Sequence, residues 1–159
     1  MTQPDGDTLS LTIVSGGQTG ADRAALDWAI DHHLPHGGWC PAGRLAEDGS
    51  IPGRYQLRET KSMSYAERTR LNVEQSDATL IVSPTSPVGG TLLTIRHAQE
   101  VGKPVLLVTR ENEDAAPDLL RTFLQEHDVR VLNVAGPRAS GSPEVETMVF
   151  RLLDRAIGT

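Results

Sequence analysis

The chain has 159 residues, of which 38% are hydrophobic and 23% charged, and this predicts one globular domain spanning residues 1–159. Its formal net charge of -6 disfavours nucleic acid and anionic membranes as partners, because both are held mainly by neutralising phosphate groups. No apolar stretch approaches the roughly 20 residues of a membrane helix, and the first residues are polar and acidic, unlike a secretory leader. We therefore expect a cytoplasmic protein without a membrane span.

The cysteine and histidine content argues against a structural metal. Cys40 is the single cysteine, so an internal disulfide is excluded. His36, four residues before it, is the only metal-like companion, and one thiolate with one imidazole falls short of a closed zinc site. We expect no structural metal and a structural loop position for Cys40.

The expected elements begin with a strand, a helix and a weaker strand. Residues 9–15 form a short β-branched run that predicts a buried strand. A helix is expected after Gly20, with an apolar stripe that would face a sheet. The stripe consists of Ala25, Leu26, Ala29 and Ile30. Residues 36–40 predict a further short strand, although their glycines weaken it.

The middle of the chain predicts a helix followed by a strand. Ser64 and Glu67 form a capping-box signature, in which a hydroxyl and a carboxylate satisfy the first free backbone donors of a helix. This helix is expected to run to about Gln75. Residues 78–83 then read ATLIVS, a short apolar run typical of a buried parallel strand.

The last third continues the alternation of helix and strand. Helices are expected over 91–101, from Pro117 to about 127, and from Ser142 to 157, the last acting as a lid or an oligomer interface. Strands are expected over 104–109 and 129–134. The alternation predicts an α/β fold of one Rossmann-like domain, with three layers and a mostly parallel sheet of four to five strands flanked by helices. Residues 1–8 are expected to be a flexible N-terminus.

A glycine-rich loop, SGGQTG over residues 15–20, follows the first expected strand and opens the first helix. Free backbone amides at such a helix start can bind a phosphate or another oxyanion. Ser15 replaces the first glycine of the dinucleotide fingerprint, and no acidic residue lies about 20 positions further on, which disfavours ordinary NAD binding. No lysine follows Gly20, which disfavours a Walker A loop. The structural alternative is that these glycines only allow a tight turn.

A second loop of the same kind follows the strand over residues 78–83. It runs through PTSPVGGT, and its last residues, Gly89, Gly90 and Thr91, would open the next helix. Ligands of doubly wound sheets bind beyond the carboxyl ends of the strands. If the strands over 9–15 and 78–83 are adjacent, both loops meet in one crevice, with Ser83 at the end of the second strand.

Four segments carry a resemblance to a known family. SGGQTGADRAALDWAI, HGGWCPAGRLAEDG, RTRLNVEQSDATLIVS and GGTLLTIRHA occur in this order over most of residues 11–109 and resemble the molybdenum-cofactor carrier family. That family is a circularly permuted relative of the Lonely-guy and lysine-decarboxylase-like group. The resemblance implies a Rossmann-like fold with phosphate-binding loops and a homo-oligomer, a dimer or tetramer. It also implies the molybdenum cofactor (molybdopterin), a phosphorylated heterocycle, as ligand, and molybdoenzymes as acceptors.

The same resemblance bears on catalysis. The phosphoribohydrolase branch has P-G-G-x-G-T-x-x-E in its second loop, and here Thr94 stands in place of the glutamate. A hydroxyl cannot act as the general acid or stabilise a sugar cation, so we expect binding without turnover and assign no catalytic residue. Two alternatives stay open: a nucleotide hydrolase that uses another acid, Asp22 or Glu47, and a sensor that binds a nucleotide derivative.

Charged residues near the first loop complete the candidate site. Asp22 suits a helix start, and Arg23 could bind a phosphate or a pterin carbonyl, although a solvated pair is the alternative. Arg44, with other arginines of the loop-rich stretch, could add a cationic mouth. Arg68 and Asn72 share one helical face that could point at the crevice. The expected binding residues are Gly16, Gly17, Gln18, Thr19, Gly20, Asp22, Arg23, Arg44, Ser83, Gly89, Gly90 and Thr91.

Overall fold

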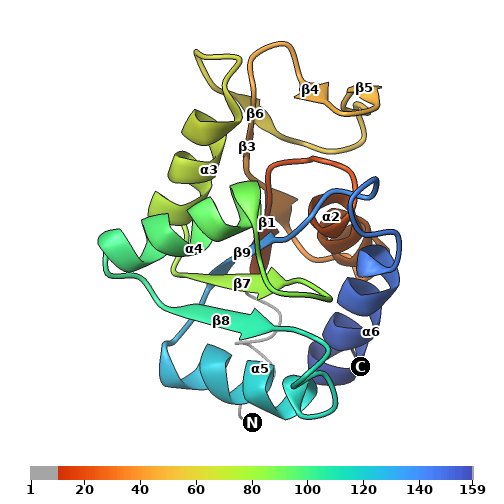
Figure 1. Cartoon of the computed structure of the whole chain (residues 1–159), viewed down its shortest axis with the longest axis vertical. Helices are drawn as coiled ribbons and strands as arrows, with labels where there is room; N and C mark the ends of the chain where they lie inside the picture. The colour runs from red at the N-terminus through yellow and green to blue at the C-terminus, as the bar shows by residue number, and fades with distance from the viewer. Residues whose placement is uncertain (1–10, 159) are drawn as a thin grey trace, which may run out of the picture.

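The fold is an α/β Rossmann-like domain, described by a computed structural model over residues 11–158 (Figure 1). The segment 1–8, expected to be flexible, lies outside the described residues. The main sheet has five parallel strands in the order β2-β1-β9-β7-β8, which confirms the expected fold class. Its strands are β1 (Thr12–Val14), β2 (His36–Gly37), β7 (Ala78–Val82), β8 (Val105–Val108) and β9 (Val131–Ala135).

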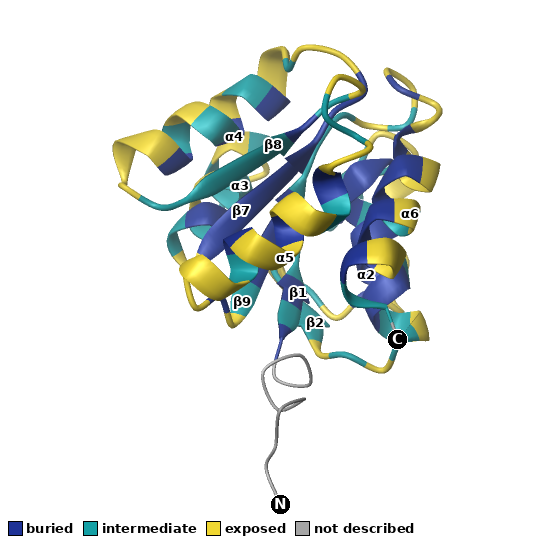
Figure 2. Ribbon diagram, turned by 90° about the horizontal axis from the view of Figure 1, so that it is seen from below, coloured by how far each residue is buried: buried dark blue, intermediate teal, exposed yellow. Residues whose placement is uncertain are grey.

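Five helices of the described chain cover the two faces of this sheet. They are α2 (Ala21–Asp31), α3 (Tyr65–Glu74), α4 (Gly89–Glu100), α5 (Ala116–Glu126) and α6 (Val145–Ile157). On one face α6 packs against both α2 and α5, whereas α3 and α4 pack together on the other. Figure 2 shows the sheet between α4 on one side and α5 and α6 on the other. No helix within residues 11–158 is long and apolar enough to cross a membrane.

The core explains why the last helix is not a lid. All five residues of β7 are buried, as a strand covered on both faces requires. The apolar stripe of α6, which includes Val149 and Leu153, is buried against α2, α5 and the sheet. Each such side chain contributes roughly 1.5–3 kcal/mol by leaving water. The expectation of a lid is therefore wrong, because the apolar stripe packs inside the chain. An oligomer interface on the remaining surface of 142–157 stays a prediction.

The expected strand over 36–40 divides into two short strands. His36–Gly37 joins the main sheet as β2, and β3 (Trp39–Cys40) pairs with β6 (Arg58–Glu59) in a separate ladder. Gly38 separates them with a φ of 125°, and a Cβ there would lie 2.2 Å from the Ser15 carbonyl oxygen. Only glycine allows this close approach. Cys40 is buried, and no group of three potential metal-ligating side chains occurs among the residues that the structure describes.

The first turns of α3 and α4 differ in part from the caps that the sequence predicts. Ser64 caps α3 as expected, with its Oγ accepting a hydrogen bond from Ala66 N at 3.1 Å. Glu67 reaches back to Ser62 N instead of Ser64 N. Helix α4 begins at Gly89, two residues before Thr91, and no side chain caps it. Its first free amides are therefore left for another partner.

The order of the strands corrects one expectation. Strands β1 and β7 are not adjacent, because β9 lies between them and pairs with both. Since all these strands are parallel, their carboxyl ends open on the same edge of the sheet. The loop after β9, residues 136–142, therefore lies between the two glycine loops.

Candidate ligand-binding site

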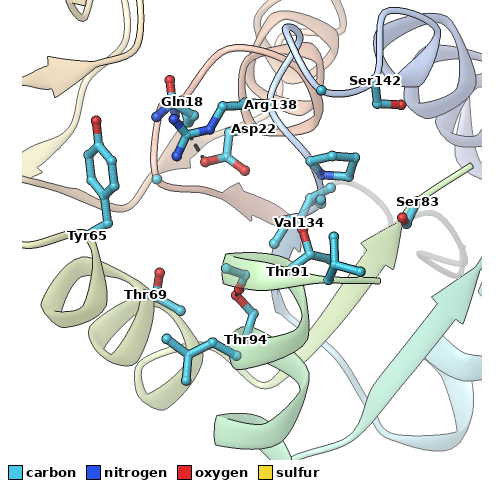
Figure 3. Close-up of a pocket in the computed structure, with 18 of the residues that line it drawn as sticks. Gln18, Asp22, Tyr65, Thr69, Ser83, Thr91, Thr94, Val134, Arg138 and Ser142 are labelled. Carbon is cyan, nitrogen blue, oxygen red and sulfur yellow. Dashed lines mark hydrogen bonds between the residues drawn. The ribbon is translucent and has the colours of Figure 1, made fainter. Parts of the chain in front are cut away.

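A cavity of about 330 Å³ lies at this edge of the sheet (Figure 3). Its wall is built from the loop before α2, the first turns of α3, the β7–α4 loop with the start of α4, and the segment 133–142. This volume lies at the lower end of the range for small-molecule sites. Segments far apart in the sequence therefore form one concave surface of small-ligand size.

Half of the residues expected to bind a ligand line the cavity. These are Gly16, Gln18, Asp22, Ser83, Gly90 and Thr91. The others do not form its wall: Gly17, Thr19, Gly20, Arg23, Arg44 and Gly89. The two glycine loops thus share one cavity, as expected, although each contributes only part of its length.

Two glycines of the first loop serve the turn itself. Gly17 and Gly20 have φ values of 79° and 87°, which side chains rarely adopt. A Cβ on Gly17 would meet Leu57 at 2.6 Å, on the side of the loop that packs against the rest of the chain. A Cβ on Gly20 would lie 2.4 Å from Pro137 O. For these two residues the structural alternative accounts for the glycine.

The side chain of Gln18 is held in one orientation. Its Oε1 accepts hydrogen bonds from two backbone amides, Thr19 N at 3.0 Å and Glu47 N at 2.8 Å. Because both partners are donors, the atom between them must be the oxygen. The amide nitrogen, Nε2, is buried and has no hydrogen-bond partner among the described residues. A buried donor without a partner is rare and marks a place where a further group can bind.

Asp22 and Arg68 form a buried pair on the cavity wall. The Asp22 carboxylate accepts from Gln18 N at 3.2 Å, and Arg68 Nη1 lies 3.6 Å from its Oδ2. Burial raises the pKa of Asp22, an effect that Arg68 and the backbone amides of Gln18 and Gly16 oppose. Arg68 also donates to Gly16 O at 2.9 Å. Both side chains are therefore fixed in place before any ligand binds.

Arg23 and Arg44 are bound by protein groups and do not form the expected cationic mouth. Arg23 forms a bidentate salt bridge with Asp48, in which Nη1 and Nη2 donate to the two carboxylate oxygens at 2.6 and 2.8 Å, and its Nε donates to Gly17 O. Arg44 donates to three backbone carbonyls of the loop that follows it, those of residues 51, 52 and 55. Their guanidinium groups hold the loops together.

A short β-hairpin is hydrogen-bonded to the first glycine loop, residues 15–20. It consists of β4 (Leu45–Ala46) and β5 (Gly49–Ser50), with Glu47 and Asp48 at its tip. The Glu47 carboxylate accepts from the hydroxyls of Thr19 and Ser140, and these bonds hold its pKa below the ordinary value. The Arg23 side chain lowers the pKa of Asp48 in the same way. The hairpin tip thus ties the loop before α2 to the loop after β9.

The start of α4 forms the opposite wall. Gly90 and Thr91 lie in its uncapped first turn, and Ser142 faces the same cavity from the loop after β9. The Ser142 Oγ is buried and lacks a hydrogen-bond partner among the described residues. Thr94 is also on the wall, but its hydroxyl donates to Gly90 O at 2.9 Å. This end offers backbone amides and a hydroxyl to an anion, and Thr94 takes no part.

Comparison with known proteins gives a family for this arrangement. The profile of the "Circularly permutated YpsA SLOG family" matches residues 13–157. The chain belongs to this family. A solved structure of a protein from Syntrophus aciditrophicus SB, described as "Putative molybdenum carrier protein", is 48% identical and superposes with a TM-score of 0.89. The match covers 92% of this chain and 94% of that chain. No curated protein matches.

Three residues on the wall of the SLOG cavity were not singled out by the sequence patterns: Tyr65, Asn133 and Arg138. The Arg68 and Arg138 guanidinium carbons lie 5.1 and 5.6 Å from the centroid of the Tyr65 ring. Asn133 contributes from the centre of β9. Asn72, expected with Arg68 to point at the crevice, also lines the cavity, and its side-chain amide is hydrogen-bonded to Trp39 N and Trp39 O. The position of Arg68 and Asn72 on one helical face was the only sequence signal for the part of the wall that α3 forms.

The wall of the SLOG cavity is rich in hydrogen-bond donors. Donors predominate: Arg68 and Arg138, the Gln18 amide, Ser142, and the first amides of α4. Asp22 is the carboxylate on the wall. Glu47, the other acid considered for hydrolysis, is engaged by Thr19 and Ser140 outside the wall.

Proposed function

We propose that this protein binds the molybdenum cofactor and stores or transfers it without chemical turnover. The observation that carries the proposal is a pair of buried polar atoms, Gln18 Nε2 and Ser142 Oγ, without partners among the described residues, in side chains that line one cavity together with the uncapped start of α4. Unpaired buried groups cost about 1–3 kcal/mol each, and a ligand that pairs them recovers this. The name of the Syntrophus protein supports the choice of ligand.

The ligand chemistry matches the wall at both ends. A pterin phosphate carries an anionic group that the amides of α4 attract, and a flat polar ring that suits Tyr65 and the two arginines near it. Such a carrier would hand the cofactor to molybdoenzymes and would form a homo-oligomer, a dimer or tetramer. Both of these are part of the proposal and are tested separately by transfer assays and by solution mass.

Absence of turnover is proposed from the acids near the cavity. Thr94 stands where the related hydrolase motif has its glutamate, and its hydroxyl is spent on Gly90 O. Asp22 faces the cavity, and burial raises its pKa while Arg68 opposes that rise, but no second carboxylate from the described residues lines the wall to act with it, as hydrolysis of a glycosidic bond requires. The rival nucleotide hydrolase would have to use Asp22 in this paired state.

The test is retention of free molybdenum cofactor on gel filtration, read as the fluorescent oxidised pterin, with and without excess AMP. Retention that AMP does not displace is the expected result. No retention of the cofactor, with AMP bound in its place, would refute the proposal and favour a nucleotide-binding protein. Adenine released from the bound AMP would then identify a hydrolase, and tight binding without release would identify a sensor.

A further inference from the structure

We propose that the ligand lies in one orientation, with its phosphate at the start of α4 and its ring edge at Gln18 and Asp22, and that these two side chains select a 2-amino-4-oxopyrimidine ring. Pterin and guanine share this ring chemistry, whereas adenine lacks it. The inference rests on the proposed function, since it names the ligand class of the same cavity.

The phosphate end follows from charge. The Asp22 carboxylate already accepts Gln18 N at the start of α2, so a phosphate there would face a buried negative group. No side chain of the described residues caps the start of α4, and Ser142, only 7% exposed, lines the same cavity with a buried hydroxyl that has no partner among those residues. The anion therefore binds at α4, where amides and a hydroxyl meet it without repulsion.

The ring end follows from the fixed direction of the Gln18 amide. Two backbone N–H groups hold its oxygen, and so the nitrogen that remains without a partner can only donate. Gln18 is only 5% exposed, and this donor has no hydrogen-bond partner among the residues that the structure describes. The ligand must therefore offer the Gln18 amide nitrogen a hydrogen-bond acceptor, such as a ring carbonyl oxygen.

Asp22 supplies the complementary acceptor. Its contacts with Gln18 N and Arg68 both involve Oδ2. Figure 3 shows the other carboxylate oxygen without a drawn bond and turned toward the open cavity. A carboxylate has about four lone-pair sites, so it can accept further donors from a ligand. A donor and an acceptor thus lie on neighbouring side chains of one short loop.

A 2-amino-4-oxopyrimidine ring presents the matching row of groups. Its 4-carbonyl accepts from Gln18 Nε2, while its ring N–H and 2-amino group donate to Asp22. Adenine offers one donor and one acceptor on the equivalent edge, so it makes one hydrogen bond fewer to the carboxylate. Loss of one hydrogen bond to a charged group weakens binding by roughly tenfold to hundredfold.

The experiment replaces the hydrogen-bond acceptor at Asp22 by a donor and measures which nucleotide the protein then prefers. Dissociation constants for GMP, AMP and xanthosine monophosphate are measured by equilibrium dialysis with the wild-type chain and with Asp22→Asn. The wild type should bind GMP at least tenfold more tightly than AMP. Asp22→Asn replaces an acceptor by a donor, so it should lose affinity for GMP and gain it for xanthosine monophosphate, which has a carbonyl in place of the 2-amino group. A gain of affinity cannot arise from misfolding.

A second variant tests the phosphate end. Ser142→Ala should weaken all three nucleotides by a similar factor and leave the ratio of GMP to AMP affinity unchanged, because the base edge is untouched. Displacement of bound GMP by free molybdenum cofactor then shows whether the cavity binds the pterin ring more tightly than the guanine ring.

Two results would overturn the inference. AMP binding as tightly as GMP, or Asp22→Asn without any change of preference, would show that these side chains do not read the ring edge, while phosphate-dependent binding itself would stand. Failure of free cofactor, GMP and AMP alike to bind would instead reject the proposed function, and the inference with it.

Discussion

Gly90→Ala separates stability from binding at the start of α4. Gly90 lies in the first turn of the helix and lines the cavity, and a Cβ added there meets nothing within 4 Å. Its φ lies outside the left-handed region, so alanine fits the backbone. Alanine in place of a helical glycine stabilises by about 0.5–1 kcal/mol, which raises Tm by roughly 1–4 °C in a chain of this size.

Ligand binding should change in the opposite direction. The new methyl group occupies the space through which a phosphate approaches the amides of α4. Loss of one charge-assisted hydrogen bond weakens binding by about 1.5–3 kcal/mol, a roughly tenfold to hundredfold rise in Kd. Thermal unfolding followed by circular dichroism gives the first quantity, and cofactor retention or equilibrium dialysis gives the second.

A matched control is available in the same chain. Gly53 also has open space where a Cβ would lie and no left-handed φ, but it does not line the cavity. Gly53→Ala should therefore leave the affinity unchanged. If Gly90→Ala binds as tightly as the wild type, the anion does not lie at the start of α4, and the orientation argued above is wrong.

Three further predictions concern the scaffold of the site. Gly20→Ala should lower the free energy of unfolding by more than about 2 kcal/mol in urea titrations, since its φ is 87° and the Cβ would lie 2.4 Å from Pro137 O; a change near zero would contradict this. Leu153→Ala, at a fully buried position, should cost about 2–5 kcal/mol with an unchanged m value, and a smaller loss would mean that α6 is not part of the core. Glu47 and Asp48 have pKa values held below their ordinary 4.5 and 3.8, so the stability that their contacts contribute is present above those values and is lost as the pH falls through the lowered pKa values. Titration of the side-chain carboxyl carbons by NMR should give a midpoint below pH 4.5 for Glu47 and below pH 3.8 for Asp48. Midpoints at or above these values would show that the hydrogen bonds of the hairpin tip are absent in solution.

The regular elements were predictable because they depend on local periodicity. The run over 78–83 became β7 almost residue for residue, and the capping signature at Ser64 marked the true start of α3. The glycine loops were recognisable because glycine is required where φ is positive, as at Gly17 and Gly20. These are signals that a stretch of a few residues carries by itself.

The pairing of distant segments was not predictable in this way. Nothing in the pattern of β9 indicates that it inserts between β1 and β7, and this insertion is what brings Arg138 and Ser142 to the cavity. The same limit applies to Arg23, whose guanidinium meets Asp48 only because the hairpin folds back onto the first loop. Which charge meets a ligand and which meets another side chain is decided by tertiary contacts.

The position of β9 also determines how late during synthesis the main sheet can be completed. Thr12 pairs with Val131, so the first strand of the sheet waits for almost the whole chain before its central neighbour exists. Contacts of such large sequence separation slow folding, because the intervening chain must be ordered before they form. The segment that completes the sheet leads directly into residues 136–142, the last wall of the cavity. A nascent chain therefore acquires the central strand of its sheet and the last wall of the cavity in the same late step.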